Sequence, residues 1–392
     1  MKWCVIFVLA VLFKAVDRVG GSCNLSLKQD FGNPAPVYLR NGDFVEPNAD
    51  GAILLRRAET LQIACPGDRK FIVLNNDTTK LDVIDVKCVS DSTFRAAKLG
   101  WVGHLKEIRC NAPPWFTVEK TSAVCYGGNN IYRVGYKILN KFHLLYEACF
   151  DRGTLTTVYV KHRLSPTSYF GQVTHRPQFI EGDLFPQVRM SQLYKAEQQR
   201  SRLDTLLGRG MGEKYVTKNS FLNRGHLAAK ADFSMAAMQR ATFHYINAVP
   251  QWNRGNAGDW AALEEALRRR LKTYNSSVDV YTGTHGVMSL ADQKLFLHTD
   301  ENNNGVVPVP LYFYKVIYDP QKKLAAAFIS INSPYYNAST NDALSYCDDI
   351  CPRFSWLRWR ANDATHSFCC AYSDHSAVVR ALPPLDVKGL FY

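Results

Sequence analysis

The chain has 392 residues, of which 46% are hydrophobic and 21% are charged, and its formal net charge is +12. This composition excludes an intrinsically disordered chain. The length exceeds what one hydrophobic core usually organises, so we expect two folded domains.

Residues 1–22 predict a secretory signal peptide. Lys2 precedes an apolar run from Trp3 to Phe13, and small residues follow at 20–22. The run is shorter than the ~20 residues of a membrane-spanning helix, so an uncleaved signal anchor is the less favoured alternative. Cleavage would leave a net charge of about +10 and no membrane segment, which predicts a secreted, extracellular or lumenal protein. Four sequons, which fit glycosylated surface loops, begin at Asn24, Asn76, Asn275 and Asn337.

Residues 23–130 predict a small β domain tied by disulfides. Short β-type runs such as AILL at 52–55 and LDVIDVKC at 81–88 alternate with turn sequences. No catalytic constellation appears here, which leaves binding, shielding or folding as its expected role. An even number of cysteines after an export signal predicts disulfides, although the sequence leaves their pairing open. The ten are Cys23, Cys65, Cys88, Cys110, Cys125, Cys149, Cys347, Cys351, Cys369 and Cys370, and the last four also permit the less favoured alternative of a zinc site.

Residues 131–392 predict a mixed α+β domain. Runs such as LTTVYVKH at 155–162 and VPLYFYKVIY at 309–318 are typical of strands, and stretches near 190–207 and 257–274 are typical of helices. We therefore expect a mixed or antiparallel sheet flanked by helices.

The segment from Pro186 to Lys230 is strongly basic, with nine Lys or Arg residues against three acidic ones. Such a charge run would attract a polyanion. A solvated basic surface is the plainer interpretation of the charge alone. An anionic membrane is the least favoured partner, because no long apolar face accompanies the charges.

The stretch 257–274 predicts an amphipathic helix. Its apolar positions recur at a spacing of three and four residues, and the helical projection places Asn256 on the same side as this stripe. Glu264 and Arg268 lie four residues apart at the edge of the stripe. The plainer interpretation is a surface helix with one Glu–Arg pair and Asn256 as its N-cap.

The sequence NRGH at 223–226 and the polar residues after it resemble the DNA/RNA non-specific endonucleases. These are ββα-metal nucleases with a DRGH hallmark, and the likeness is greatest to secreted nucleases of insects that degrade double-stranded RNA. The resemblance is strongest over residues 215–274. The matching residues after the motif are Asn247, Gln251, Asn256, Trp260, Glu264 and Arg268.

This resemblance implies a role for each matching residue. His226 would be the general base, Asn256 the ligand of one divalent cation, Mg²⁺ or alternatively Mn²⁺, and Glu264 a holder of the cation's water. Arg224 and Arg268 would contact phosphate, and Asn247 would orient His226 or the substrate. The residues that would bind substrate are Arg163, Lys230 and Gln251. Gly225 would let the phosphate approach.

One position departs from the hallmark, because Asn223 replaces its Asp. We expect this loss of charge to alter the pH optimum rather than the activity, since the Asp would favour protonated His226. The resemblance implies a secreted endonuclease that cleaves RNA, double-stranded RNA above all, and possibly DNA, leaving 5′-phosphates. The alternatives are a nucleic-acid-binding protein without turnover and a precursor masked by residues 23–130. The sequence does not give the oligomeric state.

Overall fold

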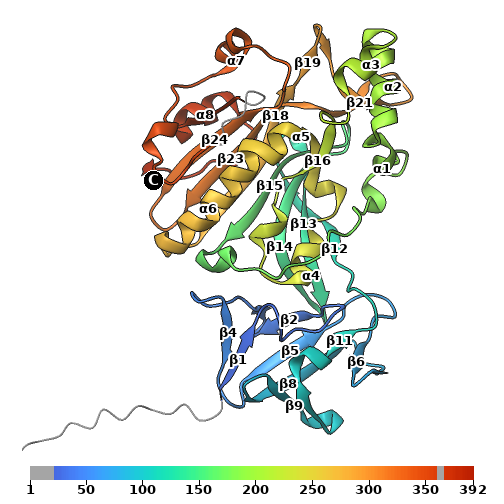
Figure 1. The fold of residues 1–392 in the computed structure, drawn as a ribbon, viewed down its shortest axis with the longest axis vertical. Helices are drawn as coiled ribbons and strands as arrows, with labels where there is room; N and C mark the ends of the chain where they lie inside the picture. The colour runs from blue at the N-terminus through green and yellow to red at the C-terminus, as the bar shows by residue number, and fades with distance from the viewer. Residues whose placement is uncertain (1–21, 360–365) are drawn as a thin grey trace, which may run out of the picture.

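The computed structural model describes residues 22–359 and 366–392, which form a smaller all-β unit and a larger α+β unit (Figure 1). The predicted signal peptide lies outside the described residues except for Ser22. No helix of the described residues is long and apolar enough to cross a membrane.

The smaller unit contains a six-stranded antiparallel sheet in the order β10-β9-β8-β5-β2-β3, a pair β1–β4, and a three-stranded sheet β11-β6-β7. Disulfides Cys23–Cys88 and Cys65–Cys110 tie these short strands together. The strands are β1 (Cys23–Ser26), β2 (Val37–Arg40), β3 (Asp43–Phe44), β4 (Ala52–Leu55), β5 (Thr60–Ala64), β6 (Ile72–Leu74), β7 (Asp77–Thr78), β8 (Val83–Ser90), β9 (Thr93–Ala96), β10 (Trp101–His104) and β11 (Arg109–Cys110).

The larger unit is built on a nine-stranded sheet in the order β12-β13-β14-β15-β18-β23-β24-β25, with β26 also paired to β24. Only the β24–β26 pair is parallel, so the sheet is mixed, as the sequence predicted. Its strands are β12 (Thr117–Val124), β13 (Asn130–Ile138), β14 (Lys141–Asp151), β15 (Thr156–Leu164), β18 (Val278–Val287), β23 (Pro310–Asp319), β24 (Leu324–Ile331), β25 (His366–Cys370) and β26 (Gly389–Leu390).

The boundary between the two sheets lies earlier than the expected 130/131. Strand β12 pairs with β13, so the chain has entered the large sheet by Thr117. Cys125 likewise pairs with Cys149 of β14. The sequence predicted β12 as part of the first domain, because residues 23–130 form one continuous cysteine-rich stretch.

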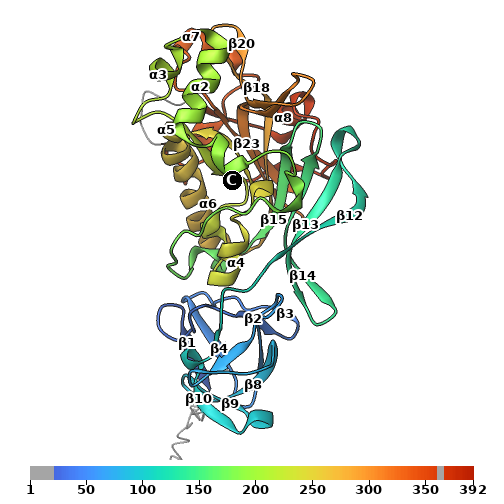
Figure 2. The ribbon, with the colours of Figure 1, turned by 90° about the vertical axis from the view of Figure 1, so that its right-hand side faces the viewer.

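Helices flank both faces of the large sheet, which confirms the predicted α+β class. Helix α6 covers one face and α8 lies on the other (Figure 2). The helices are α1 (Met190–Leu193), α2 (Ala196–Leu207), α3 (Met211–Tyr215), α4 (Ala236–Ala241), α5 (Asn253–Gly255), α6 (Ala261–Tyr274), α7 (Ala338–Leu344) and α8 (Tyr372–Val378). Disulfides Cys347–Cys370 and Cys351–Cys369 use the four C-terminal cysteines, so the zinc alternative fails.

A two-stranded sheet carries the NRGH sequence. Strand β16 (Leu222–His226) pairs antiparallel with β17 (Ala248–Trp252), and α5, a π-helical turn (Asn256–Trp260) and α6 follow directly. This order gives the ββα arrangement that the resemblance implied. The remaining short pairs are β19 (Ser289–Leu290) with β20 (Gln293–Lys294), and β21 (Phe296–Thr299) with β22 (Gly305–Pro308).

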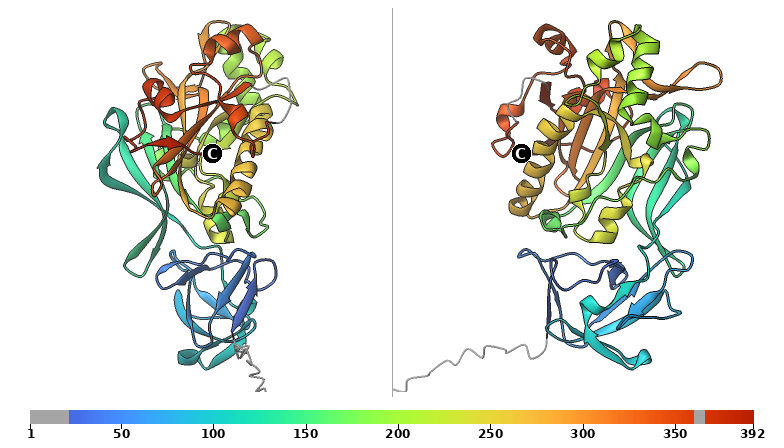
Figure 3. Two further views of the ribbon diagram at one scale, coloured as in Figure 1. Left: turned by 90° about the vertical axis from the view of Figure 1, so that its left-hand side faces the viewer. Right: turned by 45° about the vertical axis from the view of Figure 1, so that its right-hand side comes forward.

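The smaller unit lies against one end of the larger one (Figure 3). Ring contacts of Phe44 with Tyr136 and His143, at 6.4 and 5.9 Å between centroids, cross this junction. Gln172 Nε2 also donates a hydrogen bond of 3.2 Å to the Leu27 carbonyl. The two units are therefore joined by apolar packing as well as by the chain between β11 and β12.

Candidate nuclease site

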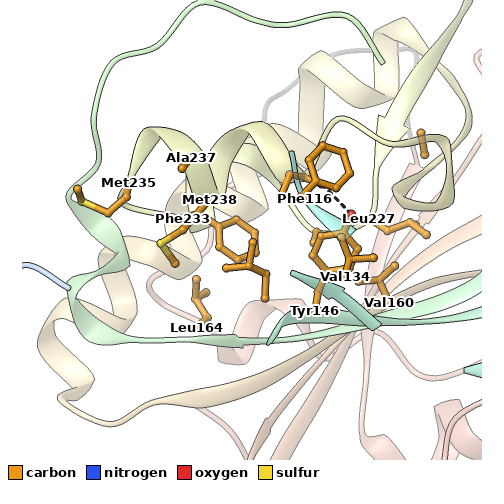
Figure 4. Packing of buried hydrophobic residues seen from close by; sticks show 14 of the residues in the cluster. Phe116, Val134, Tyr146, Val160, Leu164, Leu227, Phe233, Met235, Ala237 and Met238 are labelled. Carbon is orange, nitrogen blue, oxygen red and sulfur yellow. Dashed lines mark hydrogen bonds between the residues drawn. The ribbon is translucent and has the colours of Figure 1, made fainter. Parts of the chain in front are cut away.

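Strand β16 presents Arg224 and His226 on the same face, because side chains two residues apart in a strand point the same way. The next residue, Leu227, is buried in the core beside Val134 and Tyr146 (Figure 4). Its amide donates to the Asn247 carbonyl at 3.0 Å. The end of β16 that carries His226 is thus fixed by packing and by backbone hydrogen bonds.

His226 is half-buried between two aromatic rings, with centroids 5.0 Å from Phe179 and 4.8 Å from Phe243. Its Nε2 is enclosed and makes no hydrogen bond with any described residue. Burial, together with the charges of Arg176 and Lys230, lowers the pKa of His226 to about 3. The imidazole is therefore neutral at physiological pH.

Arg224 lies in an aromatic pocket next to His226. Its Nε donates a 2.8 Å hydrogen bond to the Tyr245 hydroxyl, and its guanidinium carbon lies 5.0 Å from the ring centre of Tyr194. Phe179 contacts Arg224 as well, at 5.7 Å, and so packs against both site residues of β16. Stacking on rings orients a guanidinium for bidentate recognition of phosphate.

Asn247 has a different position from the one expected. It is fully buried, and its Nδ2 donates to the carbonyls of Ala228 and Thr242 at 2.9 and 3.0 Å. Its Oδ1 accepts from the Ala228 amide at 2.8 Å. The carboxamide therefore contacts neither His226 nor solvent, but holds the backbone two residues beyond His226.

Gln251 and Gly225 pack against each other on the opposite face of the hairpin. A Cβ at Gly225 would lie 2.5 Å from Gln251 Oε1, and Gln251 is only 2% exposed. Gln251 is therefore enclosed within the hairpin and fills the space beside Gly225, and substrate binding by Gln251 and phosphate approach at Gly225 stay predictions. Asn223 faces this side as well, so strand alternation separates position 223 from the imidazole.

A buried set of ionisable residues lies beside α6, and we call it the charged cluster: His162, Asp232, Glu264, Arg268 and Lys315. Asp232 accepts from His162 Nε2 at 2.9 Å and from Arg268 Nη1 at 2.7 Å. Lys315 Nζ donates to Thr282 Oγ1 at 2.6 Å. Sequence reasoning found only Glu264 and Arg268 of this set.

Glu264 has an unusual acidity within the charged cluster. Burial and the charge of Asp232 raise its pKa to about 7, against the opposing charges of Lys315 and Arg268. Asp232 shows the reverse, because the hydrogen bond from His162 and the charge of Arg268 outweigh burial and hold its pKa well below the usual range. One carboxyl therefore titrates near neutral pH while its neighbour stays ionised.

Arg163 lies on the face of the large sheet opposite α6, and its predicted role in substrate binding stays a prediction. In β15, Val160, His162 and Leu164 are buried beneath α6, whereas Arg163 is exposed on the other face and donates to Ser277 Oγ at 3.1 Å. Strand alternation makes its neighbour His162 the residue that reaches the site. The signal available in the sequence was the apolar residues at alternating positions of 156–164, namely Val158, Val160 and Leu164.

Asn256 begins the π-helical turn rather than capping α6. The backbone leaves the helical region at Gly258 (φ −90°, ψ −118°), so α6 begins at Ala261, and the predicted continuous helix from Asn256 is wrong. The half-buried carboxamide of Asn256 makes no hydrogen bond with any described residue. A neutral oxygen donor with unused lone pairs fits a hard divalent cation that retains most of its water.

Lys230 and Arg268 line a shared hollow of about 350 Å³, together with Gln172 and Gln239. Lys230 Nζ donates to the Thr174 carbonyl at 2.8 Å, and burial together with Arg176 lowers its pKa. This hollow connects the surroundings of His226 to the charged cluster. Among the residues described, no hydrogen bond, ion pair or ring contact joins His226 directly to Asn256 or Glu264.

Arg176 is a further cation of the site that sequence reasoning missed. Its guanidinium carbon lies 5.7 Å from the centre of the Phe243 ring, and its charge acts on both His226 and Lys230. Arg176, Arg224 and Lys230 form no ion pair with a carboxylate within the described part of the chain. The His226 end of the site therefore carries uncompensated positive charge.

Comparisons with known proteins point to one family. Residues 127–371 match the family model of the DNA/RNA non-specific endonucleases. The salivary endonuclease of Lutzomyia longipalpis is 28% identical, covering 98% of this chain and 91% of that protein. The salivary protein Tsal2A of Glossina morsitans morsitans is 24% identical (98% and 98%), and the salivary endonuclease of Culex quinquefasciatus is 26% identical (83% and 79%). A chain in the crystal structure of the EndoG/EndoGI complex is 19% identical with a TM-score of 0.37, covering 64% of this chain and 89% of that one. The matched segment 127–371 contains every candidate site residue.

Proposed function

This chain belongs to the DNA/RNA non-specific endonuclease family and is therefore a nuclease, and we propose that it is a secreted, metal-dependent enzyme. Its proposed substrates are RNA, duplex RNA above all, and also DNA. The observation that carries this proposal is a neutral, half-buried His226 beside three cations that lack a carboxylate partner among the described residues. Such a site is complete only when an anion occupies it.

His226 would act as the general base. Since Nε2 is enclosed by Phe179 and Phe243, we assign the proton to Nε2 and the accepting lone pair to Nδ1. A phosphate beside Arg176 and Lys230 offsets the two charges that lower the pKa of His226, so its basicity rises when substrate binds. General bases of this kind typically contribute a factor of ~10²–10⁴ to the rate.

The cations would hold the phosphodiester. Arg224 is oriented by its aromatic pocket, and Lys230 is anchored by Thr174, so both keep N–H groups available for phosphate oxygens. Arg268 is paired with Asp232 and would contribute mainly by holding α6 against the sheet. Asn247 would act as a positioning residue, through the backbone that follows His226.

Members of this family typically depend on a divalent metal, and Asn256 would hold it here, with Glu264 accepting hydrogen bonds from its water. Mg²⁺ fits best, because it keeps several waters and accepts few protein ligands, and Mn²⁺ is the alternative. When bound, the cation would supply positive charge for the non-bridging oxygens and the leaving 3′ oxygen. We propose products that carry 5′-phosphates.

Secretion is supported by the predicted signal peptide, by five disulfides and by the salivary origin in the relatives' names. The proposed chemistry makes no use of a 2′-hydroxyl, so both RNA and DNA remain substrates. A preference for duplex RNA would come from groove shape and 2′-hydroxyl contacts outside the reacting centre. A binding protein without turnover is the alternative, and the intact His226, Asn256 and Glu264 argue against it.

Digestion of matched duplex RNA, single-stranded RNA and duplex DNA, with Mg²⁺ and with EDTA, tests the proposal. We expect duplex RNA to be cut fastest and all cleavage to stop in EDTA. Asn256→Ala should lose the metal-dependent activity, whereas the exposed loop variant Asn302→Ala should retain it. Full activity in EDTA would reject the cation, and wild-type rates for Asn256→Ala would reject its assigned ligand.

A further inference from the structure

A cavity of about 810 Å³ lies between the two units. Its charged lining residues are Lys28 from the smaller unit, Arg176 from the loop after β15, and Arg240 from α4, and the imidazole of His175 lies on the same wall as Arg176. No carboxylate of the described residues lines it. A cavity with only basic groups on its walls favours an anionic occupant.

One glutamine holds the walls of this cavity together. Gln172 Nε2 donates to the Leu27 carbonyl at 3.2 Å, and its Oε1 accepts from the Ala236 amide at 2.7 Å. Gln239 Nε2 donates to the Gln172 carbonyl at 2.9 Å. These hydrogen bonds hold the smaller unit, the loop at 171–177 and α4 in place relative to one another. The walls of the cavity are therefore held by specific contacts of the fold.

The cavity reaches the His226 end of the site. Arg176 lines it and also lies over Phe243, the ring that packs against His226. Thr174 lines it as well, and the Thr174 carbonyl accepts from Lys230. A strand of nucleic acid whose reacting phosphate lies beside His226 would therefore pass directly into the space between the two units.

We propose that the smaller unit is a wall of the substrate channel, in which Lys28 and Arg240 bind backbone phosphates a few nucleotides from the bond that is cut. This inference rests on the proposed function. It is the opposite of a masking role, because a mask would offer carboxylates to Arg176 and Arg240, and the smaller unit instead offers a lysine. Three cationic walls facing one another are stabilised only by an anion between them.

The test compares a duplex RNA of about 100 base pairs with an oligonucleotide of about six residues, using full-length Lys28→Glu and Arg240→Ala. Removing one cation that binds a backbone phosphate should make the dependence of log kcat/KM on log salt concentration shallower by about one. We expect the ratio of kcat/KM on the long to the short substrate to fall about tenfold in Lys28→Glu, less in Arg240→Ala. The control is Lys98→Ala, an exposed lysine beside β9 and β10 at the far end of the smaller unit (Figure 2), which should leave both rates unchanged.

Binding decides the inference separately from turnover. The affinity of His226→Ala protein for the long duplex, measured by fluorescence anisotropy, should fall when Lys28→Glu is added. Unchanged affinity and an unchanged rate ratio would reject the channel wall, and a higher rate on the long duplex would indicate a mask. A wild-type protein that binds the duplex but cuts neither substrate would reject the proposed function and leave the binding result to decide the channel.

Discussion

His226 and His162 lie at the two ends of the site, and the charges around the two imidazoles differ. His162 donates to the ionised Asp232, which also pairs with Arg268, so that end contains its own counter-ions. His226 faces aromatic rings and three cations, and no carboxylate of the described residues pairs with them. The first arrangement holds helix and sheet together, and in our proposal the second binds a phosphate.

The difference follows from the cost of burying charge. A buried ion pair is stable only when each member keeps its partner, so the charged cluster is sensitive to the loss of any one residue. A neutral imidazole costs much less to bury than an ion and has no ionic partner that its removal would leave unpaired, so we expect the His226 end to lose its side chain without loss of the fold. Catalysis and stability should therefore depend on different residues of one site.

The largest expected effect is on turnover. His226→Ala should lower the cleavage rate by at least ~10²–10⁴, because the accepting nitrogen is lost, while the free energy of unfolding changes by about 1 kcal/mol or less. Zymography and thermal melting measure the two quantities on one preparation. A variant that cuts at the wild-type rate, or that fails to fold, breaks the contrast between the two imidazoles.

The largest expected effect on stability is at Asp232. Asp232→Asn removes the partner of both His162 and Arg268, and should lower the free energy of unfolding by about 3–5 kcal/mol. The control is Asp279→Asn, which breaks a partly exposed pair with Lys161 on the opposite face of the sheet and should cost about 1 kcal/mol or less. Equal losses in the two variants, by urea denaturation, would show that burial of the cluster carries no special cost.

A third comparison is between Arg163, which the sequence favoured for phosphate binding, and Arg176, which the structure favours. Arg176→Ala should lower kcat/KM by about 10–100-fold, since a charge-assisted phosphate contact contributes about 1.5–3 kcal/mol. Arg163→Ala should have no effect, because Arg163 lies on the far face of the sheet. Steady-state kinetics on one RNA duplex measure both, and the reverse result would restore Arg163 to the site.

The smallest expected effect is the pH dependence of Glu264. Its folded pKa of about 7 lies above its ordinary value of 4.5, so the folded protein binds this proton more tightly and its stability falls as pH rises from 4.5 to 7. Glu264→Gln should therefore stabilise the protein at pH 8 by on the order of 1–2 kcal/mol, allowing for partial exposure, and have little effect at pH 4.5. Glu265→Gln, exposed on the same helix, is the control for thermal melting. Destabilisation at pH 8 would mean that pairing with Lys315 and Arg268 outweighs burial.

Apolar periodicity in the sequence predicted the helix and strands whose buried faces are determined within one segment of the chain. The predicted apolar stripe is buried at Trp260, at the end of the π-helical turn, and at Leu263, Leu267 and Leu271 of α6, because helical periodicity alone determines which side chains face a core. The strands of the large sheet were recognisable for the same reason. Ten cysteines predicted disulfides, but only folding brings Cys125 to Cys149 across the domain boundary expected from composition.

The rest depends on contacts between distant segments, which no single stretch encodes. His162 and Asp232 are 70 residues apart in sequence. The space beside Gly225 is filled by the side chain of Gln251 on the neighbouring strand. Arg163 and His162 are neighbours in β15, and a shift of one residue in a strand exchanges the two faces of a sheet. Resemblance located the β16 and α6 residues, whereas Arg176 and the charged cluster required the fold.

The most direct test of the central claim is the pKa of His226, measured by NMR on histidine-labelled full-length protein, with the signal identified by its loss in His226→Ala. Without ligand, we predict that His226 stays neutral down to a pH well below its ordinary value of 6.5, and that a non-hydrolysable dinucleotide phosphorothioate raises its pKa. A His226 that titrates near 6.5 in the free protein and is unmoved by the dinucleotide would contradict the account.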